Sequence, residues 1–439
     1  AMFFAISCDD PRMSWSRKRT LGAGLLALGI VSAAVLKPRE LPAPRDPYFD
    51  GIASEIKAHG LHHSVAILDL DRIDANLAAI RRVLGSDFQL RATTKSLPSY
   101  ELLEYVLDAT SSRRVMEFYG PFLHPLVERL GSVRPIDVLL GKPLPVGDLE
   151  QYLSRSQATT QALRPVGSGS VVRFLIDTSE RLDAYLEVAR RRNVQLDVAL
   201  ELDIGLHRGG AADSDSLLAM VQKIERSEGR LRLGGVMGYD GHVAHAPPLL
   251  QSTAAAEQDA FRAAMQNLGH FTRALQERFP KLVQRDFIIN GGGSKTYARY
   301  RLPDGKAVGP VNELALGSAI LKPADFDHPM LSSHQPALFI AEPVLKRTSP
   351  GRLPFADAIG ALWRWWNPNR HDSVFVYGGG WDLTPVYPGG LSSNPFYNDR
   401  PADNRIPNQT LLNAGRHHPV QPGDLVFYRP LQSDTIMQF

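Results

Sequence analysis

The stretch FQLRATTKSLP, residues 88–98, decides the fold that this sequence predicts. It opens with the strand-like run Phe88–Leu90, and Ser99–Leu107 beyond it has helical spacing with a serine suited to capping. Lys95 thus stands between a strand and a helix, where α/β barrels place catalytic groups. A lysine amine there can form a Schiff base with an aldehyde cofactor when burial or a nearby cation keeps part of it neutral. Most lysines are solvated surface residues. Whether Lys95 is catalytic therefore depends on evidence from the rest of the chain.

Segments with strand character alternate with helix-like segments from residue 64 onward. Eight strand–helix repeats over about 250 residues are typical of a (β/α)8 TIM barrel, which we place at residues 64–317. A doubly wound open sheet is the alternative, although no dinucleotide-binding fingerprint follows the first strand. The eight predicted strands are Val65–Leu70, Phe88–Thr93, Arg114–Tyr119, Asp137–Leu144, Val171–Ile176, Leu196–Ile204, Leu231–Gly238 and Asp286–Asn290.

Proline, glycine and short apolar runs dominate the chain after about residue 318. They predict a smaller C-terminal all-β domain over residues 318–439. Residues 38–63 are expected to be a linker and an N-terminal segment of this domain, with Phe49–His62 pairing with its strands. The aromatic cluster Ala361–Trp366 is expected to pack on its own domain or on a partner subunit rather than on a membrane.

Residues 1–37 have the organisation of an export signal or an N-terminal membrane anchor. The basic segment Ser16–Thr20 precedes the uncharged run Leu21–Leu36, and Val31–Ala33 offers a small-residue cleavage site. We therefore expect a periplasmic protein, or a periplasmic body anchored in the inner membrane by a tether through residues 21–36.

Composition excludes several functional classes. The 439 residues carry a formal net charge of only +3, and their few short basic runs do not indicate a nucleic-acid partner. Cys8 is the single cysteine and precedes every predicted folded element. The body of the chain therefore has no disulfide, no thiolate nucleophile and no cysteine metal site.

Polar or glycine-rich segments follow four of the predicted strands, and in a barrel these strand ends meet at one mouth. The segments are Lys95 with its neighbours, Glu201–Gly210, Met237–His242 and Asn290–Thr296. Within the last, Gly291, Gly292 and Gly293 with Ser294 offer backbone N–H groups and a hydroxyl to a phosphate. A tight turn is the alternative explanation for three successive glycines.

Together these side chains suggest pyridoxal phosphate as cofactor. Lys95 would hold its aldehyde, and Gly292–Ser294 would hold its phosphate. Arg208 would stabilise the phenolate oxygen, and Tyr239 would stack on the ring. Taken singly, Arg208 is better explained by a structural ion pair and Tyr239 by a core position.

At this point the chain resembles the fold-type III pyridoxal-phosphate enzymes, the alanine racemase N-terminal domain superfamily. Within it the sequence is most similar to the D-threonine aldolase and D-serine dehydratase group, including its amino acid deaminase/aldolase branch. The resemblance implies an alanine-racemase-type barrel followed by a β-domain, a small amino acid substrate and a homodimer. The motifs that carry it are Thr94–Ser96, Glu201–Gly210, Gly235–Tyr239, Asn290–Ser294, Glu313–Ser318 and Phe375–Gly380.

The chain departs from this group where the group binds a divalent metal such as Mn, Mg or Zn. The metal-binding His-x-Asp or His-x-Cys pair corresponds here to Gln432 and Asp434. Asp434 remains a candidate ligand, but Gln432 is a poor replacement for imidazole. If no metal acidifies the substrate hydroxyl, a side-chain base is required, and His207 or His242 is the candidate.

Three functions therefore stay open. The first is a lyase that cleaves a β-hydroxy D-amino acid, as D-threonine aldolase does, to glycine and an aldehyde. The second keeps the cofactor but removes the α-proton through Lys95, which gives a dehydratase (deaminase) or an amino acid racemase. The third is a non-catalytic protein that only binds pyridoxal phosphate.

Overall fold

The computed structural model describes residues 36–97, 99–158, 170–283, 287–352, 357–379, 382–394 and 409–434. The chain divides into two compact units: a sheet unit of residues 1–65, 341–380 and 384–428, and a barrel unit of residues 66–340, 381–383 and 429–439. Nearly all of the predicted signal or anchor, residues 1–37, lies outside the described residues. Among the helices that are described, none is long and apolar enough to cross a membrane.

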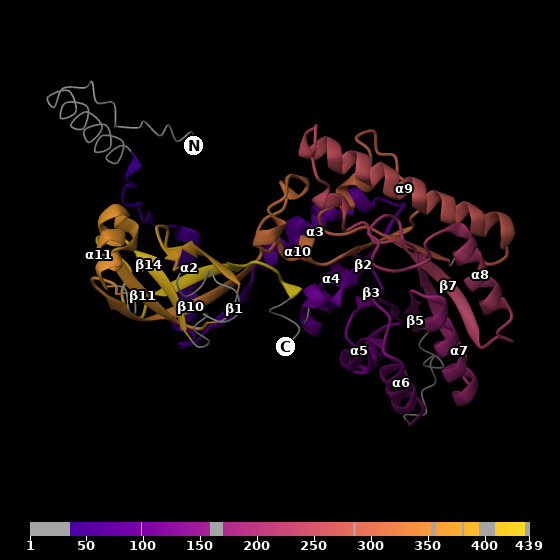
Figure 1. Ribbon diagram of the computed structural model, residues 1–439. Coiled ribbons are helices and arrows are strands. Elements are labelled where there is room, and N and C mark those ends of the chain that lie inside the picture. The colour runs from indigo at the N-terminus through magenta and orange to yellow at the C-terminus, as the bar shows by residue number, and fades with distance from the viewer. Residues whose placement is uncertain are drawn as a thin grey trace, which may run out of the picture. The chain divides into compact units, whose positions relative to one another are not determined.

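Eight parallel strands close into a barrel, as predicted, which rules out the open sheet (Figure 1). They are β2 (Gln89–Thr93), β3 (Arg114–Glu117), β4 (Asp137–Leu140), β5 (Val171–Ile176), β6 (Leu196–Glu201), β7 (Leu231–Met237), β8 (Ile288–Gly291) and β9 (Glu313–Leu316). The barrel closes where β2 pairs with β9, with Gln89 opposite Glu313 and Leu90 opposite Leu314.

The prediction assigned the wrong segment to one barrel position. Val65–Leu70, expected as the first barrel strand, holds β1 (Val65–Leu68), which pairs with β10 (Leu338–Thr348) of the other sheet. Its side chains are partly exposed, whereas all four residues of β9 are buried. β9 escaped prediction as a strand because four residues are too few to show a pattern, and its first residue, Glu313, is charged.

Helices connect the barrel strands in the order expected of βα units. Ser99 caps the helix that follows Lys95 by accepting a hydrogen bond from the backbone N–H of Leu102 at 3.3 Å. The helices of this unit are α3 (Leu70–Leu84), α4 (Tyr100–Ala109), α5 (Gly120–Val133), α6 (Val146–Ala158), α7 (Ser179–Arg192), α8 (Ser214–Glu225), α9 (Thr253–Arg278) and α10 (Ser318–Leu321).

A network of buried ions lies inside the barrel, near the strand starts. Arg91 is fully buried and donates to both carboxylate oxygens of Glu313, at 2.6 and 2.8 Å, and to Asp137 at 3.1 Å. Arg173 pairs with the other oxygen of Asp137 at 2.9 Å. A Cβ on Gly234 would lie 2.0 Å from the Arg173 guanidinium, so a side chain there would require Arg173 to move. These pairs join β2, β4, β5 and β9 at the end of the barrel opposite the strand ends that carry Lys95.

The second unit contains a seven-stranded sheet, which confirms that an all-β domain exists in addition to the barrel. Its strands run in the order β12 (Leu383–Tyr387), β15 (Leu425–Pro430), β10, β11 (Asp372–Tyr377), β14 (Gln409–Ala414) and β13 (Ser392–Ser393), with β1 beside β10. Most of the segment 49–62, expected to pair as strand, instead belongs to helix α2 (Pro47–Ala58). Asp46 caps this helix and Pro47 opens it, a helix-start signal that the prediction overlooked.

Candidate active site

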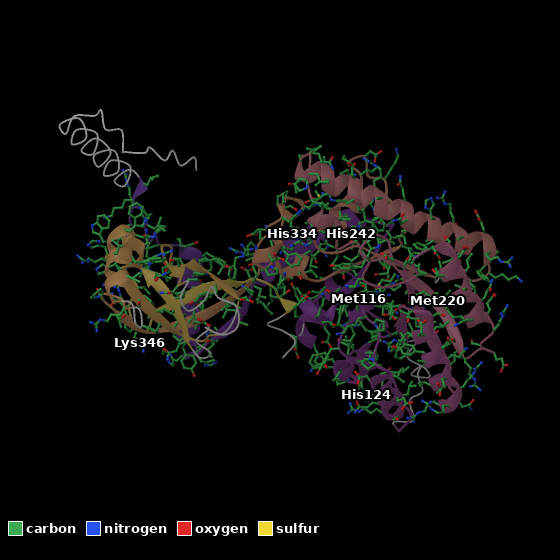
Figure 2. The ribbon with its side chains drawn as sticks, viewed as in Figure 1. Met116, His124, Met220, His242, His334 and Lys346 are labelled. Carbon is green, nitrogen blue, oxygen red and sulfur yellow. The ribbon has the colours of Figure 1, made fainter. Side chains whose placement is uncertain are left out.

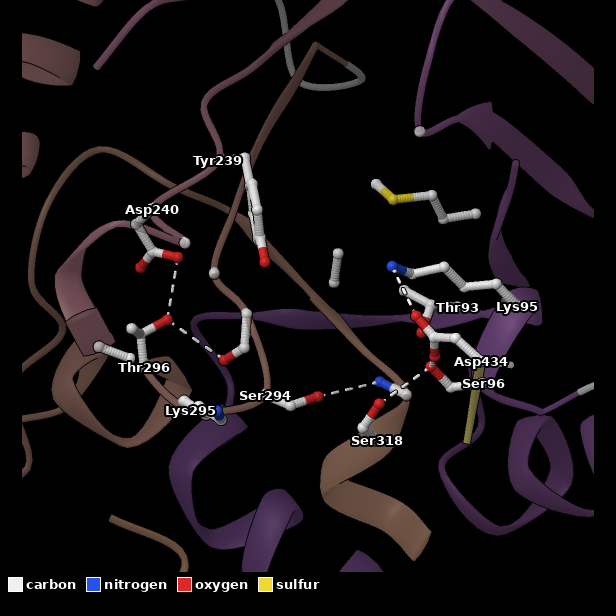
Figure 3. A pocket seen from close by; sticks show the side chains of 18 of the residues that line it. Thr93, Lys95, Ser96, Tyr239, Asp240, Ser294, Lys295, Thr296, Ser318 and Asp434 are labelled. Carbon is white, nitrogen blue, oxygen red and sulfur yellow. Dashed lines mark hydrogen bonds and ion pairs between the residues drawn. The ribbon is translucent and has the colours of Figure 1, made fainter. Parts of the chain in front are cut away.

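A cavity of about 280 Å³ opens at the carboxyl ends of the barrel strands (Figure 3). All of its lining residues belong to the barrel unit. Of the predicted site residues it brings together Lys95, Arg208, Tyr239, Gly292, Gly293, Ser294 and Asp434. Gly291 lies just before them as the last residue of β8.

Lys95 extends into this cavity from a single turn of 3-10 helix, Thr94–Ser96, directly after β2. Its Nζ atom lies 2.9 Å from Oδ2 of Asp434 and 4.7 Å from the centre of the Phe118 ring. Ser96 donates a hydrogen bond of 2.6 Å to the other oxygen, Oδ1, of Asp434. The carboxylate is thus fixed through one oxygen and bound to the lysine through the other.

The C-terminal segment brings Asp434 to the barrel through a series of polar contacts. Arg429 pairs with Asp327 at 2.7 Å, and Gln432 donates to Asp325 at 2.6 Å. Ser433 is fully buried and its hydroxyl lies 3.3 Å from that of Ser318. Because Gln432 is already bonded to Asp325, it behaves as a structural residue of this rim.

The glycine turn after β8, together with Ser294, forms one wall of the cavity. Gly292 has φ +83°, where a side chain would be strained, and a Cβ there would lie 3.1 Å from Leu314. A Cβ on Gly293 would lie 3.2 Å from the Tyr239 ring. The Ser294 hydroxyl accepts a hydrogen bond from the N–H of Ala319 at 3.0 Å. The N–H of Gly292 donates to the hydroxyl of Tyr300 at 3.0 Å. A phosphate at the predicted position would therefore depend on the other backbone N–H groups of the turn and on the Ser294 hydroxyl.

Tyr239 projects into the cavity from the side opposite Lys95 (Figure 3). The guanidinium of Arg208 lies 5.2 Å from the centre of its ring, and Arg208 also pairs with the buried Glu201 at 3.1 Å. Burial raises the pKa of the Glu201 carboxyl, although Arg208 opposes this shift. Burial likewise raises the pKa of Tyr239, so its phenol stays protonated at neutral pH.

Asp240 is a functional candidate that the sequence analysis missed. It lines the cavity, is fully buried and accepts hydrogen bonds from Thr296 at 2.9 Å and Tyr300 at 3.0 Å. Burial raises its pKa to about 6. These bonds join the loop after β7 to the turn after β8, so Asp240 fixes Tyr239 and the glycine turn relative to each other. Its place in the strand-end segment Met237–His242, next to Tyr239, was the available signal.

The two predicted histidine bases do not line the cavity. His207 is exposed and its Nδ1 lies 2.8 Å from Asp203, in a separate hollow that also contains His270. His242 (Figure 2) packs against Gly205, where an added Cβ would lie 2.9 Å from its Nε2. Burial lowers the pKa of His242. The histidine that the structure does bring to the cavity is His245.

A second, smaller cavity of about 120 Å³ adjoins Lys95. Leucine and aromatic side chains dominate its lining, which comprises Thr94, Lys95, Leu97, Ser99, Tyr100, Leu103, Glu117, Tyr119, Phe122 and Leu126. The lining includes the buried carboxylate of Glu117, which accepts hydrogen bonds from the N–H groups of Phe118 at 2.7 Å and Tyr119 at 2.8 Å. This cavity offers apolar volume next to the lysine.

The main cavity suits the cofactor predicted from the sequence better than it suits a metal. An amine, a ring, a guanidinium and a glycine turn line one space, which matches the aldehyde, ring and phosphate of pyridoxal phosphate. Around Asp434 the donors do not fit a divalent ion, because Gln432 is bonded to Asp325 and Asp434 to Lys95. Within the described ranges, no group of three or more His, Cys, Asp or Glu side chains is arranged to hold a metal.

Comparison with known proteins defines the class of fold. Residues 151–279 match the family model of the alanine racemase N-terminal domain. A search among curated protein sequences finds no match. The predicted resemblance to the fold-type III group is thus confirmed by the family match and by the fold.

Three solved structures illustrate the likeness. D-Threonine aldolase from Filomicrobium marinum has a TM-score of 0.61 and 18% identity, over 86% of this chain and 91% of that one. D-threo-3-Hydroxyaspartate dehydratase from Delftia sp. HT23 has a TM-score of 0.60 and 16% identity, over 85% and 91%. Alanine racemase from Bacillus anthracis has a TM-score of 0.54 and 13% identity, over 83% and 85%. At these identities the likeness establishes the fold.

Proposed function

We propose that this protein is a pyridoxal-phosphate-dependent lyase that cleaves a β-hydroxy D-amino acid to glycine and an aldehyde. The observation that carries the proposal is the pair formed by Lys95 and Asp434 at 2.9 Å, inside a cavity whose other wall is the glycine turn. The fold shared with D-threonine aldolase supports it.

The chain's own residues divide the work between holding the cofactor and moving protons. Lys95 would hold the aldehyde, the Gly292–Ser294 turn the phosphate, and Arg208 with Tyr239 the ring. When bound, pyridoxal phosphate supplies an electron sink for the breaking bond. Oδ2 of Asp434, the oxygen that Ser96 does not bond, lies at the cavity beside the Nζ atom of Lys95. Asp434 is then the group placed to take the proton of the substrate's β-hydroxyl at Oδ2, while Ser96 holds Oδ1.

A dehydratase or racemase is the alternative, and one observation favours it. The Nζ atom of Lys95 is itself a proton carrier that faces the cavity, and it can exchange protons with Asp434 across 2.9 Å. Removal of the α-proton by Lys95 would lead to loss of water, or to the opposite α-configuration after the proton returns on the other face. The same residues therefore serve three reactions that differ in the bond broken.

Product analysis separates these reactions. The full chain, loaded with pyridoxal phosphate, is incubated with D-threonine and with D-phenylserine, which has an apolar side chain suited to the smaller cavity. We expect glycine and the matching aldehyde, formed equally with added manganese and with a chelator. A 2-oxo acid would identify a dehydratase, and an α-epimer a racemase. Failure of both substrates to react, with cofactor bound through Lys95, would contradict the lyase proposal and favour the non-catalytic alternative.

A further inference from the structure

Helix α11 (Asp357–Trp366) of the sheet unit has an unusual surface. A surface helix normally turns polar residues to water and buries its apolar stripe. Here the exposed side chains are apolar: Ile359 is 61% exposed, Leu362 64%, Trp365 60% and Trp366 37%. With about 100° between successive residues, they lie on one side of the helix.

Arg364, a charged residue of α11, lies on its packed side instead. Arg364 is partly buried and donates a hydrogen bond of 2.5 Å to the carbonyl of Gly351. Trp363, also half-buried, packs under the guanidinium of Arg370 at 4.1 Å. The expected packing of the aromatic cluster on its own domain therefore applies to Trp363. Trp365 and Trp366, together with Ile359 and Leu362, form an outward apolar face.

The chain that leads from the apolar N-terminal run passes directly beside this face. Asn369, in the turn after α11, binds the backbone carbonyl of Arg39 at 2.8 Å and the N–H of Leu41 at 2.6 Å. Lys37 places its Nζ atom 4.8 Å from the centre of the Trp365 ring. Leu36 and Leu41, which are 71% and 56% exposed, extend the apolar surface along this segment.

We propose that the outward face of α11 binds the surface of an anionic lipid bilayer. The uncharged sequence Leu21–Leu36 ends one residue before Lys37, so a bilayer that takes up this run lies at the edge of the α11 face. Tryptophan favours the bilayer interface, and Lys37 and Arg39 suit anionic headgroups. α11 is far too short to span a bilayer, but an amphipathic helix of this kind lies in the interface plane. The helix thus gives the sheet unit a second membrane contact.

Site-specific labelling of the full chain tests this proposal. In a Cys8→Ser background, Leu362→Cys carries a polarity-sensitive fluorophore and the chain is reconstituted into vesicles of phosphatidylcholine with phosphatidylglycerol. Leu345→Cys is the matched control, because Leu345 is also an exposed leucine of the sheet unit, 43% exposed, but lies on β10. We expect brominated lipids to quench the label at 362 several-fold more than the label at 345. Quenching should weaken in vesicles of phosphatidylcholine alone.

Two results would overturn the proposal. Equal quenching at both positions would mean that the chain is tethered without docking of α11. Protection of position 362 from an aqueous quencher in detergent solution, increasing with protein concentration, would mean that a second copy of the chain covers the face. A second variant, Trp365→Glu, should reduce quenching at 362 while leaving cofactor binding unchanged. The measurement is independent of the proposed lyase activity.

Discussion

The amine of Lys95 and the carboxylate of Asp434, from opposite ends of the barrel unit's sequence, form an ion pair of 2.9 Å. Ser96, the neighbour of Lys95, donates a hydrogen bond to the same carboxylate across a sequence separation of 338 residues. The pair closes the cavity where the C-terminal segment returns to the barrel. It places a carboxylate next to the lysine where the sequence pattern had suggested a metal ligand.

Asp434→Asn should lower kcat on the order of a hundredfold, because general-base catalysis contributes about 10²–10⁴-fold and an amide cannot accept the hydroxyl proton. The visible absorbance of cofactor attached to Lys95 should persist. Asp325→Asn is the comparison variant, since Asp325 lines the same cavity and bonds Lys295 and Gln432 but not Lys95. Equal turnover by wild type and Asp434→Asn would remove the aspartate from the mechanism.

Lys95→Ala should abolish turnover and the absorbance band of covalently held cofactor, because no other residue is proposed to hold the aldehyde. Reduction with borohydride followed by peptide mass spectrometry checks the attachment site. Lys295→Ala, in the same cavity, should leave the label on Lys95. A borohydride-stable label on any other lysine would contradict the assignment.

The barrel could be predicted because strand-like and helix-like segments alternate many times along the chain. Lys95, Arg208, Tyr239 and the glycine turn could be located because each of them follows the end of a strand. It failed where the deciding information is three-dimensional. β9 is too short to show periodicity, and its Glu313 is stabilised by a distant Arg91. The placement of His207 and His242 away from the cavity depends on how two loops fold back after β6 and β7.

Glu313→Gln should destabilise the barrel by roughly 3–5 kcal/mol, because it leaves Arg91 buried with an incomplete partner. Glu101→Gln, which removes an exposed carboxylate paired with Arg129, should change stability far less, because solvent screens an exposed ion pair. Urea unfolding followed by circular dichroism measures both. Similar midpoints for the two variants would show that the interior network does not hold β9 in the barrel.

His334 should make the stability of the folded protein depend on pH. Its Nε2 lies 2.6 Å from the hydroxyl of Tyr297 and its Nδ1 2.8 Å from the carbonyl of Ala319, and burial lowers its pKa to about 4 (Figure 2). A depressed histidine pKa contributes stability that is present above the unfolded value of 6.5 and is lost as pH falls toward 4. Thermal unfolding should therefore show that wild type loses its stability advantage over His334→Gln as the pH falls from 6.5 toward 4. His270→Gln, at an exposed position, is the control variant.

Glu342, in the sheet unit, should have the opposite pH dependence. Its Oε2 and the hydroxyl of Tyr428 are buried without a hydrogen-bond partner among the described residues, and burial raises the pKa of Glu342 to about 8. A carboxyl whose folded pKa is raised favours the folded state below its unfolded value of 4.5, and this contribution is lost as pH rises toward 8. Glu342→Gln does not titrate, so its stability relative to wild type should increase across that interval. Thermal unfolding of both proteins at several pH values measures the difference. A constant difference would mean that Glu342 is hydrated or paired in the folded protein.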